Sequence, residues 1–327
     1  MCCRQRATFS YLSGPDRPIV NQVATRRTKS EKGAPPHPQL GGDWTSSKLK
    51  ILGDYLAAYT VALSRQKFRL RYVDAFAGTG YRDARKREDR KAQAQLFPDL
   101  AAPEPQELLA GSALQALRTE PAFHHFTFIE RSAERCKALS ELVSRFPQIE
   151  DRVSVVKGDA NVEIQRLCKE FRPGERAVVF LDPFGMNVEW ATIEALARTH
   201  VVDLWLLFPL GIGVNRLLAR SGKIPPGWRR RLDLLLGTKD WEQAFYRAQA
   251  ESGLFEDEER LVKAKIEVIS EYFLNRLRSV FIAVSPHPRT LMNSANCPLY
   301  LLCFAASNKN GANLALKIAN DLLLRMD

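Results

Sequence analysis

The chain has 327 residues, of which 45% are hydrophobic, so it is long enough to bury one large core or two smaller ones. It contains no apolar run of the roughly 18 residues that a membrane-spanning helix needs, and its first residues lack the apolar stretch of a secretion signal. We therefore expect a soluble, cytoplasmic protein. The net charge of +11 favours an acidic partner, most commonly nucleic acid, although a merely basic protein is the alternative.

Cysteines and histidines are scattered along the chain. The six cysteines contain no CxxC pair, and neither they nor the five histidines have the spacing of metal ligands. We expect reduced thiols and no metal site.

Residues 1–43 are rich in Pro, Gly, Ser, Thr and basic residues without periodic apolar positions, which predicts a disordered basic tail before one folded domain at 44–327. Leucines and Tyr59 then recur at helical spacing from Ser46, with Thr45, Ser46 or Ser47 as possible N-cap. A strand at 70–76 follows. The charged stretch 82–110 is too long for an ordinary connection, so we interpret it as an insertion before a helix that starts at Ser112.

Strands and helices then alternate. The expected strands are 126–130, 152–159, 177–182 and 201–209, and the expected helices are 132–146, 162–171 and 188–199. Short apolar strands separated by helices indicate an α/β fold with a mostly parallel sheet that is buried on both faces. Residues 210–278 read as a wholly helical insert after the fifth strand, and two more strands, 279–284 and 298–305, precede a final helix at 312–324.

Seven strands with this insert predict the Rossmann-like fold of S-adenosylmethionine (SAM)-dependent methyltransferases. The alternative is a five-stranded nucleotide-binding fold with an unrelated C-terminal piece.

The first strand ends in the pattern D-x-F-x-G-x-G, formed by Asp74, Phe76, Gly78 and Gly80. Glycines allow the backbone to approach a ligand closely, and ligands of such sheets bind beyond the carboxyl ends of the strands. Asp83 stands where a dinucleotide site would have its third glycine, which argues against NAD. The pattern matches the first motif of SAM methyltransferases; a tight turn that needs two glycines is the alternative.

Acids end the next two strands. Glu130 can accept hydrogen bonds from both ribose hydroxyls, or can be a solvated acid at a helix start. Asp159 can accept from an adenine amino group, or can be the N-cap of the next helix. Asp74, Glu130 and Asp159, in this order along the chain and together with the glycine turn, favour a SAM site.

The fourth strand is followed by Asp182, Pro183 and Phe184. Phe184 can stack on a flat ring, while Asp182 or the Pro183 carbonyl accepts hydrogen bonds from an amine. Holding the N–H groups of an exocyclic amine directs its lone pair toward an incoming methyl group. The alternative is a turn in which Asp182 caps the helix expected at 188 and Phe184 lies in the core.

These two motifs resemble those of nucleic-acid amino-methyltransferases, and DPFG is similar to the variant in tRNA guanine-N2 methyltransferases. A longer resemblance, from about Thr45 onward, is to the three-Cys-motif partner protein family (TcmP): it includes YVDAFAGTG, FLDPFGMNVEWATIEALA, VDLWLLFPLGIGVNRLL and PLYLLCFAASN. It implies a methyltransferase-like protein encoded beside a three-cysteine, radical-SAM-like partner. The chain departs from the family in having Trp44 before Thr45 and a long 82–110 stretch.

The resemblance also draws attention to Asn215, Arg216 and Arg220, which could bind phosphate or a target base. A helix-capping Asn and solvated arginines are the alternative. Three functions stay open: a nucleic-acid N-methyltransferase, a small-molecule or peptide methyltransferase, and a non-catalytic partner protein.

Overall fold

The computed structural model describes residues 43–77, 111–219, 222–249 and 260–325. The predicted insertion at 82–110 and all but the last residue of the predicted tail lie outside these ranges.

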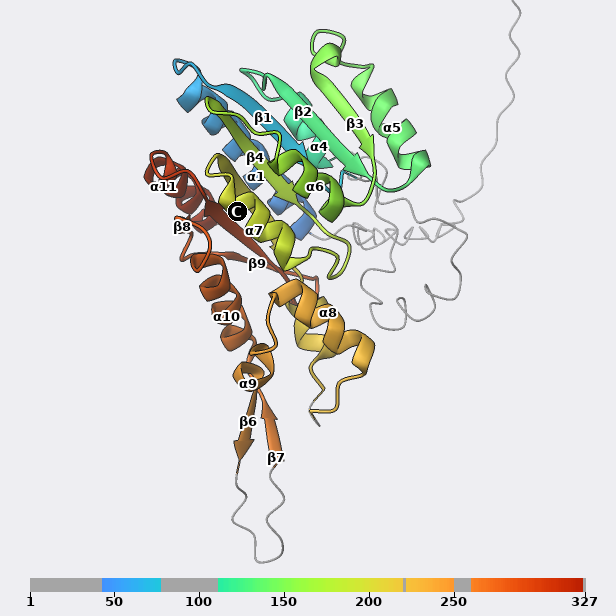
Figure 1. Ribbon diagram of the computed structural model, residues 1–327, viewed down its shortest axis with the longest axis vertical. Coiled ribbons are helices and arrows are strands. Elements are labelled where there is room, and N and C mark those ends of the chain that lie inside the picture. The colour runs from blue at the N-terminus through green and yellow to red at the C-terminus, as the bar shows by residue number, and fades with distance from the viewer. Residues whose placement is uncertain (1–42, 78–110, 220–221, 250–259, 326–327) are drawn as a thin grey trace, which may run out of the picture. The chain divides into compact units, whose positions relative to one another are not determined.

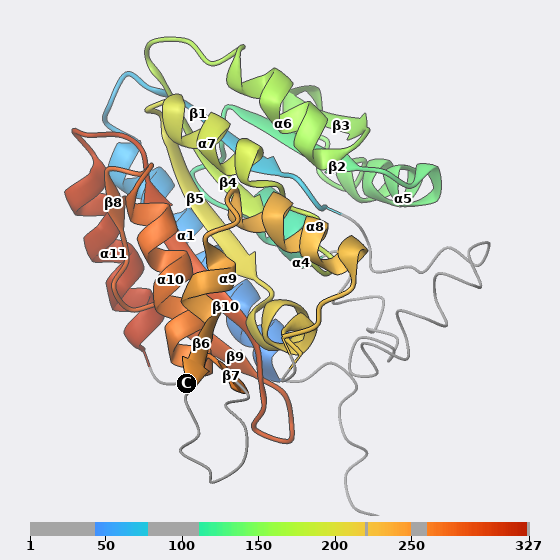
Figure 2. The same cartoon turned by 60° about the horizontal axis from the view of Figure 1, so that its bottom comes forward.

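One mostly parallel sheet organises the described residues (Figure 1). Its strands are β1 (Arg69–Asp74), β2 (His125–Glu130), β3 (Val153–Lys157), β4 (Glu175–Leu181), β5 (Val202–Phe208), β8 (Ala283–Val284), β9 (Arg289–Met292) and β10 (Pro298–Ala306). Their order is β3-β2-β1-β4-β5-β10-β8, and β9 pairs with β10. The first five strands are parallel, whereas β10 runs antiparallel to β5 and β8 and lies alongside β5 in Figure 2.

Helices cover both faces of this sheet. They are α1 (Asp43–Leu63), α4 (Gly111–Leu117), α5 (Ala133–Val143), α6 (Ala160–Cys168), α7 (Trp190–Arg198), α8 (Pro226–Leu236), α9 (Trp241–Phe245), α10 (Ile266–Arg278) and α11 (Ala312–Leu324), with a 3-10 turn η2 (Glu150–Arg152) and a π-helical turn η3 (Leu210–Asn215). Because successive side chains of a strand point to opposite faces, Val178 and Phe180 of β4 join the cluster under α1, α4, α5 and α11. Val179 and Leu181 join the cluster under α6 to α10. Covering both faces explains why all seven residues of β5 are buried.

The predicted α/β architecture is confirmed, with three differences. The sheet has eight strands rather than seven because β9 forms a short hairpin with β10. The expected strand at 279–284 is reduced to β8, two residues long. Helix α1 already begins at Asp43, so Thr45, Ser46 and Ser47 lie inside it and are not its caps.

The segment 210–278 is not wholly helical, which corrects the sequence prediction. Strands β6 (Tyr246–Gln249) and β7 (Arg260–Lys263) pair antiparallel as a separate hairpin between α9 and α10. Four residues are too few to show an alternating pattern, and Val262 falls on the apolar spacing that α10 continues. The apolar spacing therefore predicts a helix through β7 as well as α10, although β7 is a strand.

Candidate functional site

Two neighbouring parallel strands deliver carboxylates to the same edge of the sheet. Asp74 is the last residue of β1, and Asp182 directly follows β4. The two strands are paired in the register Asp74 to Phe180, and the backbone N–H of Ala75 donates to Phe180 O at 3.1 Å. The strand order reverses between β1 and β4, the place where doubly wound sheets bind their ligands.

Asp74 is completely buried. Burial raises the pKa of its carboxyl to about 7; a hydrogen bond from the Ser112 hydroxyl opposes this shift, and the charge of Asp182 adds to it. The backbone N–H of Phe76 donates to Asp74 Oδ1 at 3.3 Å, and the Tyr72 hydroxyl makes a long 3.4 Å contact with Oδ2. These contacts connect Asp74 to the start of α4 and to the turn after β1. Gly78 and Gly80 of the predicted glycine turn lie outside the described residues.

Glu130, at the end of β2, is also buried and is therefore not the solvated acid of the alternative interpretation. Its Oε1 accepts from the backbone N–H of Ser132 at 2.7 Å and from Arg135 Nη2 at 2.7 Å. Ser132 is the N-cap of α5. The contacts hold this carboxylate at the sheet edge; its role toward a ribose stays a prediction.

Asp159 follows β3 and is the N-cap of α6. Its Oδ1 accepts from the backbone N–H groups of Asn161 at 3.0 Å and Val162 at 3.4 Å. This is the capping alternative that the sequence left open, and the side chain is exposed. A capping carboxylate has a second oxygen, so a role toward an adenine amino group stays a prediction.

The turn after β4 presents an aromatic ring on the surface. The Asp182 side chain is 25% exposed, Pro183 is buried, and Phe184 is 48% exposed. Gly185 has φ +66°, a left-handed conformation that favours glycine. Helix α7 begins at Trp190 with Glu189 as N-cap, so Asp182 does not cap it and Phe184 is not in the core.

Asn161 supports this turn from α6. Its Nδ2 donates to the backbone oxygen of Asn187 at 2.9 Å, and its Oδ1 accepts from Glu189 N at 3.0 Å and Thr192 Oγ1 at 2.9 Å. Asn187 Nδ2 in turn donates to the backbone oxygen of Phe184 at 2.6 Å. The Phe184 turn is thus held by the same helix start that Asp159 caps.

The η3 turn also packs against the Phe184 turn. A Cβ at Gly213 would lie 3.1 Å from Met186 Cγ, so the glycine permits this close approach. Asn215 ends η3, where its backbone oxygen accepts from Lys263 Nζ, and Arg216 is exposed just beyond it. Arg220 lies outside the described residues.

Lys48 is a site residue that the sequence analysis missed. Its ammonium lies 2.5 Å from Asp182 Oδ2, although 134 residues separate the two. One signal was present: Lys48 precedes the buried Leu52 by four residues and Tyr55 by seven, so it falls on the apolar stripe of α1.

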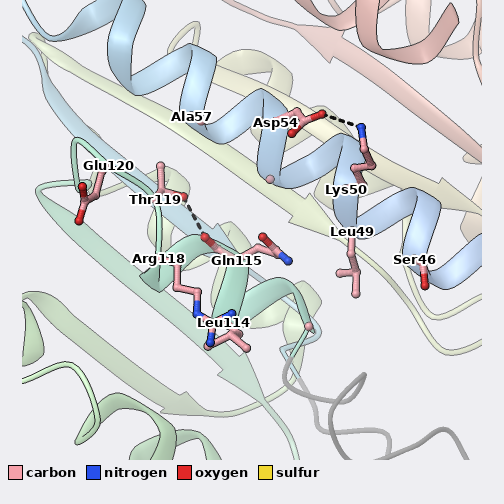
Figure 3. Close-up of a pocket in the computed structure, with 12 residues that line it drawn as sticks. Ser46, Leu49, Lys50, Asp54, Ala57, Leu114, Gln115, Arg118, Thr119 and Glu120 are labelled. Atoms are coloured by element: carbon pink, nitrogen blue, oxygen red, sulfur yellow. Dashed lines mark hydrogen bonds and ion pairs between the residues drawn. The ribbon is translucent and has the colours of Figure 1, made fainter. Parts of the chain in front are cut away.

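A cavity of about 550 Å³ lies elsewhere. It is a groove between α1 and α4 whose walls include Leu49, Lys50, Asp54, Gln115 and Arg118 (Figure 3). None of the predicted site residues lines it, nor the smaller cavity of about 220 Å³ at Glu194 and His200. Within the described ranges there is no cluster of three or more potential metal ligands, and no helix is long and apolar enough to cross a membrane.

No protein-family model matches the chain, and no curated protein does. Among solved structures, a Legionella pneumophila protein has a TM-score of 0.43 at 14% identity over 86% of this chain and 92% of its own. A spermidine synthase with a transition-state analogue has 0.38 at 8% (82% and 60% covered). A magnesium protoporphyrin IX methyltransferase from Synechocystis with bound SAH has 0.34 at 14% (80% and 84% covered).

The strand order itself defines the class of fold. Five parallel strands in the order β3-β2-β1-β4-β5, followed by an antiparallel β10 between β5 and β8, form the Rossmann-like fold of SAM-dependent methyltransferases. The fold alone does not define an activity.

Proposed function

We propose that the chain is a SAM-dependent N-methyltransferase. The observation that carries the proposal is the arrangement after β4: a partly exposed carboxylate and an exposed aromatic ring, Asp182 and Phe184, beside the buried Asp74 of β1. A hydrogen-bond acceptor next to a stacking platform, at the reversal of strand order, suits a flat acceptor molecule that carries an amine.

The acids at the sheet edge fit the chemistry of SAM. Its ribose offers hydroxyl donors and its adenine an N–H donor, which suit the carboxylates of Glu130 and Asp159. Asp74 accepts a hydrogen bond from Phe76 N at the start of the turn after β1. When bound, SAM supplies a methyl group on a positively charged sulfur. The chain itself would bind SAM, orient the acceptor and exclude water, and no covalent intermediate with a side chain is required.

Asp182 and Phe184 would orient the acceptor. The lone pair of an exocyclic amine is delocalised into its ring, so the nitrogen is a weak nucleophile. Acceptance of its N–H hydrogens by Asp182 or by the Pro183 carbonyl, with the ring stacked on Phe184, would direct the lone pair toward the methyl group. In this arrangement Asp182 would also accept the proton that the methylated nitrogen releases.

The acceptor we propose is an exocyclic amine of a nucleic-acid base. The net charge of +11 supports this, as do the exposed Arg216 after η3 and the exposed Arg230 of α8, which could contact phosphates. Stacking of a base on an aromatic side chain is worth about 1–3 kcal/mol. A small-molecule or peptide acceptor is the competing outcome of the test below.

We also propose, from the resemblance to three-Cys-motif partner proteins, that the chain works with a radical-SAM-like protein that carries the three-cysteine motif. Co-purification of the full chain with the product of a neighbouring gene tests this directly. Recovery of the chain alone at physiological salt would contradict the partner proposal and leave the methyltransferase proposal intact.

Calorimetry of the full chain with SAM tests the cofactor, and mass spectrometry of nucleic acids and metabolites from cells with and without the gene tests the acceptor. We expect SAM binding and one missing methylated base in cells without the gene.

Asp182→Ala should abolish transfer and leave SAM affinity nearly unchanged. The matched control is Asp151→Asn, an exposed acid of η2 before β3, at the opposite edge of the sheet. A chain that binds no SAM, or transfer that survives Asp182→Ala, would contradict the proposal.

A further inference from the structure

The Lys48 ammonium makes two side-chain contacts, one of them with a residue of the proposed reaction site. Its side chain is 7% exposed, and its ammonium contacts Asp182 Oδ2 at 2.5 Å. The same nitrogen lies 4.8 Å from the centre of the Trp44 ring, which packs on Tyr300 of β10 at 5.3 Å. An ion pair and a cation–π contact together restrict the ammonium to one position.

Helix α1 does not depend on this ion pair for its docking. Leu52, Tyr55 and Leu56, which are at most 1% exposed, pack in the apolar cluster on its face of the sheet. A buried ion pair is in general weak evidence for stability, because removing both charges from water offsets their attraction. Lysine at this position therefore calls for a reason other than anchoring of the helix.

The pair leaves one oxygen of Asp182 available. Lys48 occupies Oδ2, and no hydrogen bond to Oδ1 is present among the described residues. The charge of Asp182, which Lys48 pairs, also acts on the neighbouring Asp74 and raises the pKa of its carboxyl. Without the lysine, the Asp182 carboxylate would lose the one hydrogen bond that it makes among the described residues.

We propose that Lys48 is a positioning residue of the reaction: it holds the Asp182 carboxylate in one orientation, so that Oδ1 faces the amine of the acceptor. This assignment rests on the proposed function. It places the first turns of α1 on the acceptor side of the site, beside the Phe184 turn, and gives Trp44 the role of confining the ammonium.

The test compares variants of the full chain in transfer of labelled methyl groups from SAM to nucleic acid and small-molecule fractions of cells that lack the gene. Lys48→Met keeps the length of the side chain and removes its charge, and Lys48→Arg keeps the charge. Lys50→Met is the matched control, because Lys50 is on the same helix and its side chain is 63% exposed. Thermal unfolding and calorimetry with SAM accompany each variant.

We expect Lys48→Met to lower the maximal rate of transfer about 100-fold, with SAM affinity within about two-fold of wild type. Lys48→Arg should recover part of the rate and Lys50→Met should keep all of it. Combining Lys48→Met with Asp182→Asn should be no slower than Asp182→Asn alone, because the two residues act as a unit.

Three results would overturn the assignment of Lys48 while the methyltransferase proposal stands: an unchanged rate in Lys48→Met, a loss of rate explained by the unfolded fraction, or a parallel loss of SAM affinity. A wild-type chain that neither binds SAM nor transfers methyl groups would overturn both proposals. The two failures are thus distinguished by the wild type alone.

Discussion

Asn161 of α6 donates a 2.9 Å hydrogen bond to the backbone oxygen of Asn187, in the turn that carries Phe184. The same side chain accepts from Glu189 N and Thr192 Oγ1, and it is only 9% exposed. One buried amide thus connects the start of α6 to the start of α7 and to the turn that follows β4. We therefore expect the orientation of Phe184 to depend on Asn161.

We predict that Asn161→Ala lowers the free energy of unfolding by about 2 kcal/mol or more, because it leaves three partners, among them the fully buried Thr192, without their hydrogen bond. Asn187→Ala is the matched control. Asn187 is exposed, and among the described residues its side chain donates one hydrogen bond, to the backbone oxygen of Phe184, so this substitution should cost less than about 1 kcal/mol. Urea unfolding followed by circular dichroism measures both; equal losses would contradict the central role of Asn161.

The sequence predicts well where local pattern and burial agree. The final helix is observed at 312–324 as expected, because its apolar positions recur at helical spacing and pack on the sheet. The end of β2 at Glu130 is confirmed, and the end expected at Asp182 is one residue beyond that of β4. The first strand ends at Asp74, two residues before the expected end at Phe76.

Contacts between distant segments could not be predicted. The partner of Lys48 lies 134 residues away, and a lysine on an apolar stripe shows that something pairs with it but not what. Asp159 shows a different limit: one side chain satisfies both the capping pattern and the site pattern, and the structure shows the capping contact without deciding the site role. Short strands such as β6 and β8 depend on their partners and leave little pattern of their own.

Stability should depend on pH through Asp203. This buried residue of β5 accepts a 2.7 Å hydrogen bond from the Tyr55 hydroxyl, and burial raises the pKa of its carboxyl to about 7. Below about pH 4 the carboxyl is protonated in both the folded and unfolded states, whereas from about pH 4 to pH 7 only the folded state keeps the proton. Its contribution to stability is therefore full at low pH and is lost as the pH rises through about 7.

Asp203→Asn removes this titration while keeping an acceptor for Tyr55. We expect the free energy of unfolding, measured in urea from pH 4.5 to 8, to fall less steeply with pH in the variant than in the wild type, both values being measured in the same buffers. The variant should be the more stable of the two at about pH 8. Parallel pH curves would contradict the burial of an ionisable carboxyl at this position.

Gly185 should resist substitution for a backbone reason. Its φ is +66°, and a Cβ at this position would meet no atom within 4 Å, so any cost comes from the conformation rather than from a collision. We expect Gly185→Ala to lower the free energy of unfolding by about 1–2 kcal/mol. Gly227 also has open space around it but lies in α8 without a positive φ, so Gly227→Ala should be neutral or should stabilise by up to about 1 kcal/mol.

The substitution Thr45→Val tests whether the Thr45 hydroxyl, in the first turn of α1, serves stability or acceptor binding. Thr45 is 1% exposed and lies one turn before Lys48, and its Oγ1 has no hydrogen-bond partner among the described residues. A buried hydroxyl without a partner destabilises a folded protein, so Thr45→Val, which replaces it by a methyl group, should leave the free energy of unfolding unchanged or raise it by about 1 kcal/mol. Thr60→Val is the control, because the Thr60 hydroxyl donates to Ala57 O at 3.2 Å and its loss should cost about 0.5–1.5 kcal/mol. If Thr45→Val destabilises the chain as much as Thr60→Val does, the Thr45 hydroxyl has a partner within the protein. If stability is kept but the acceptor concentration needed for half-maximal methyl transfer rises, the hydroxyl affects acceptor binding.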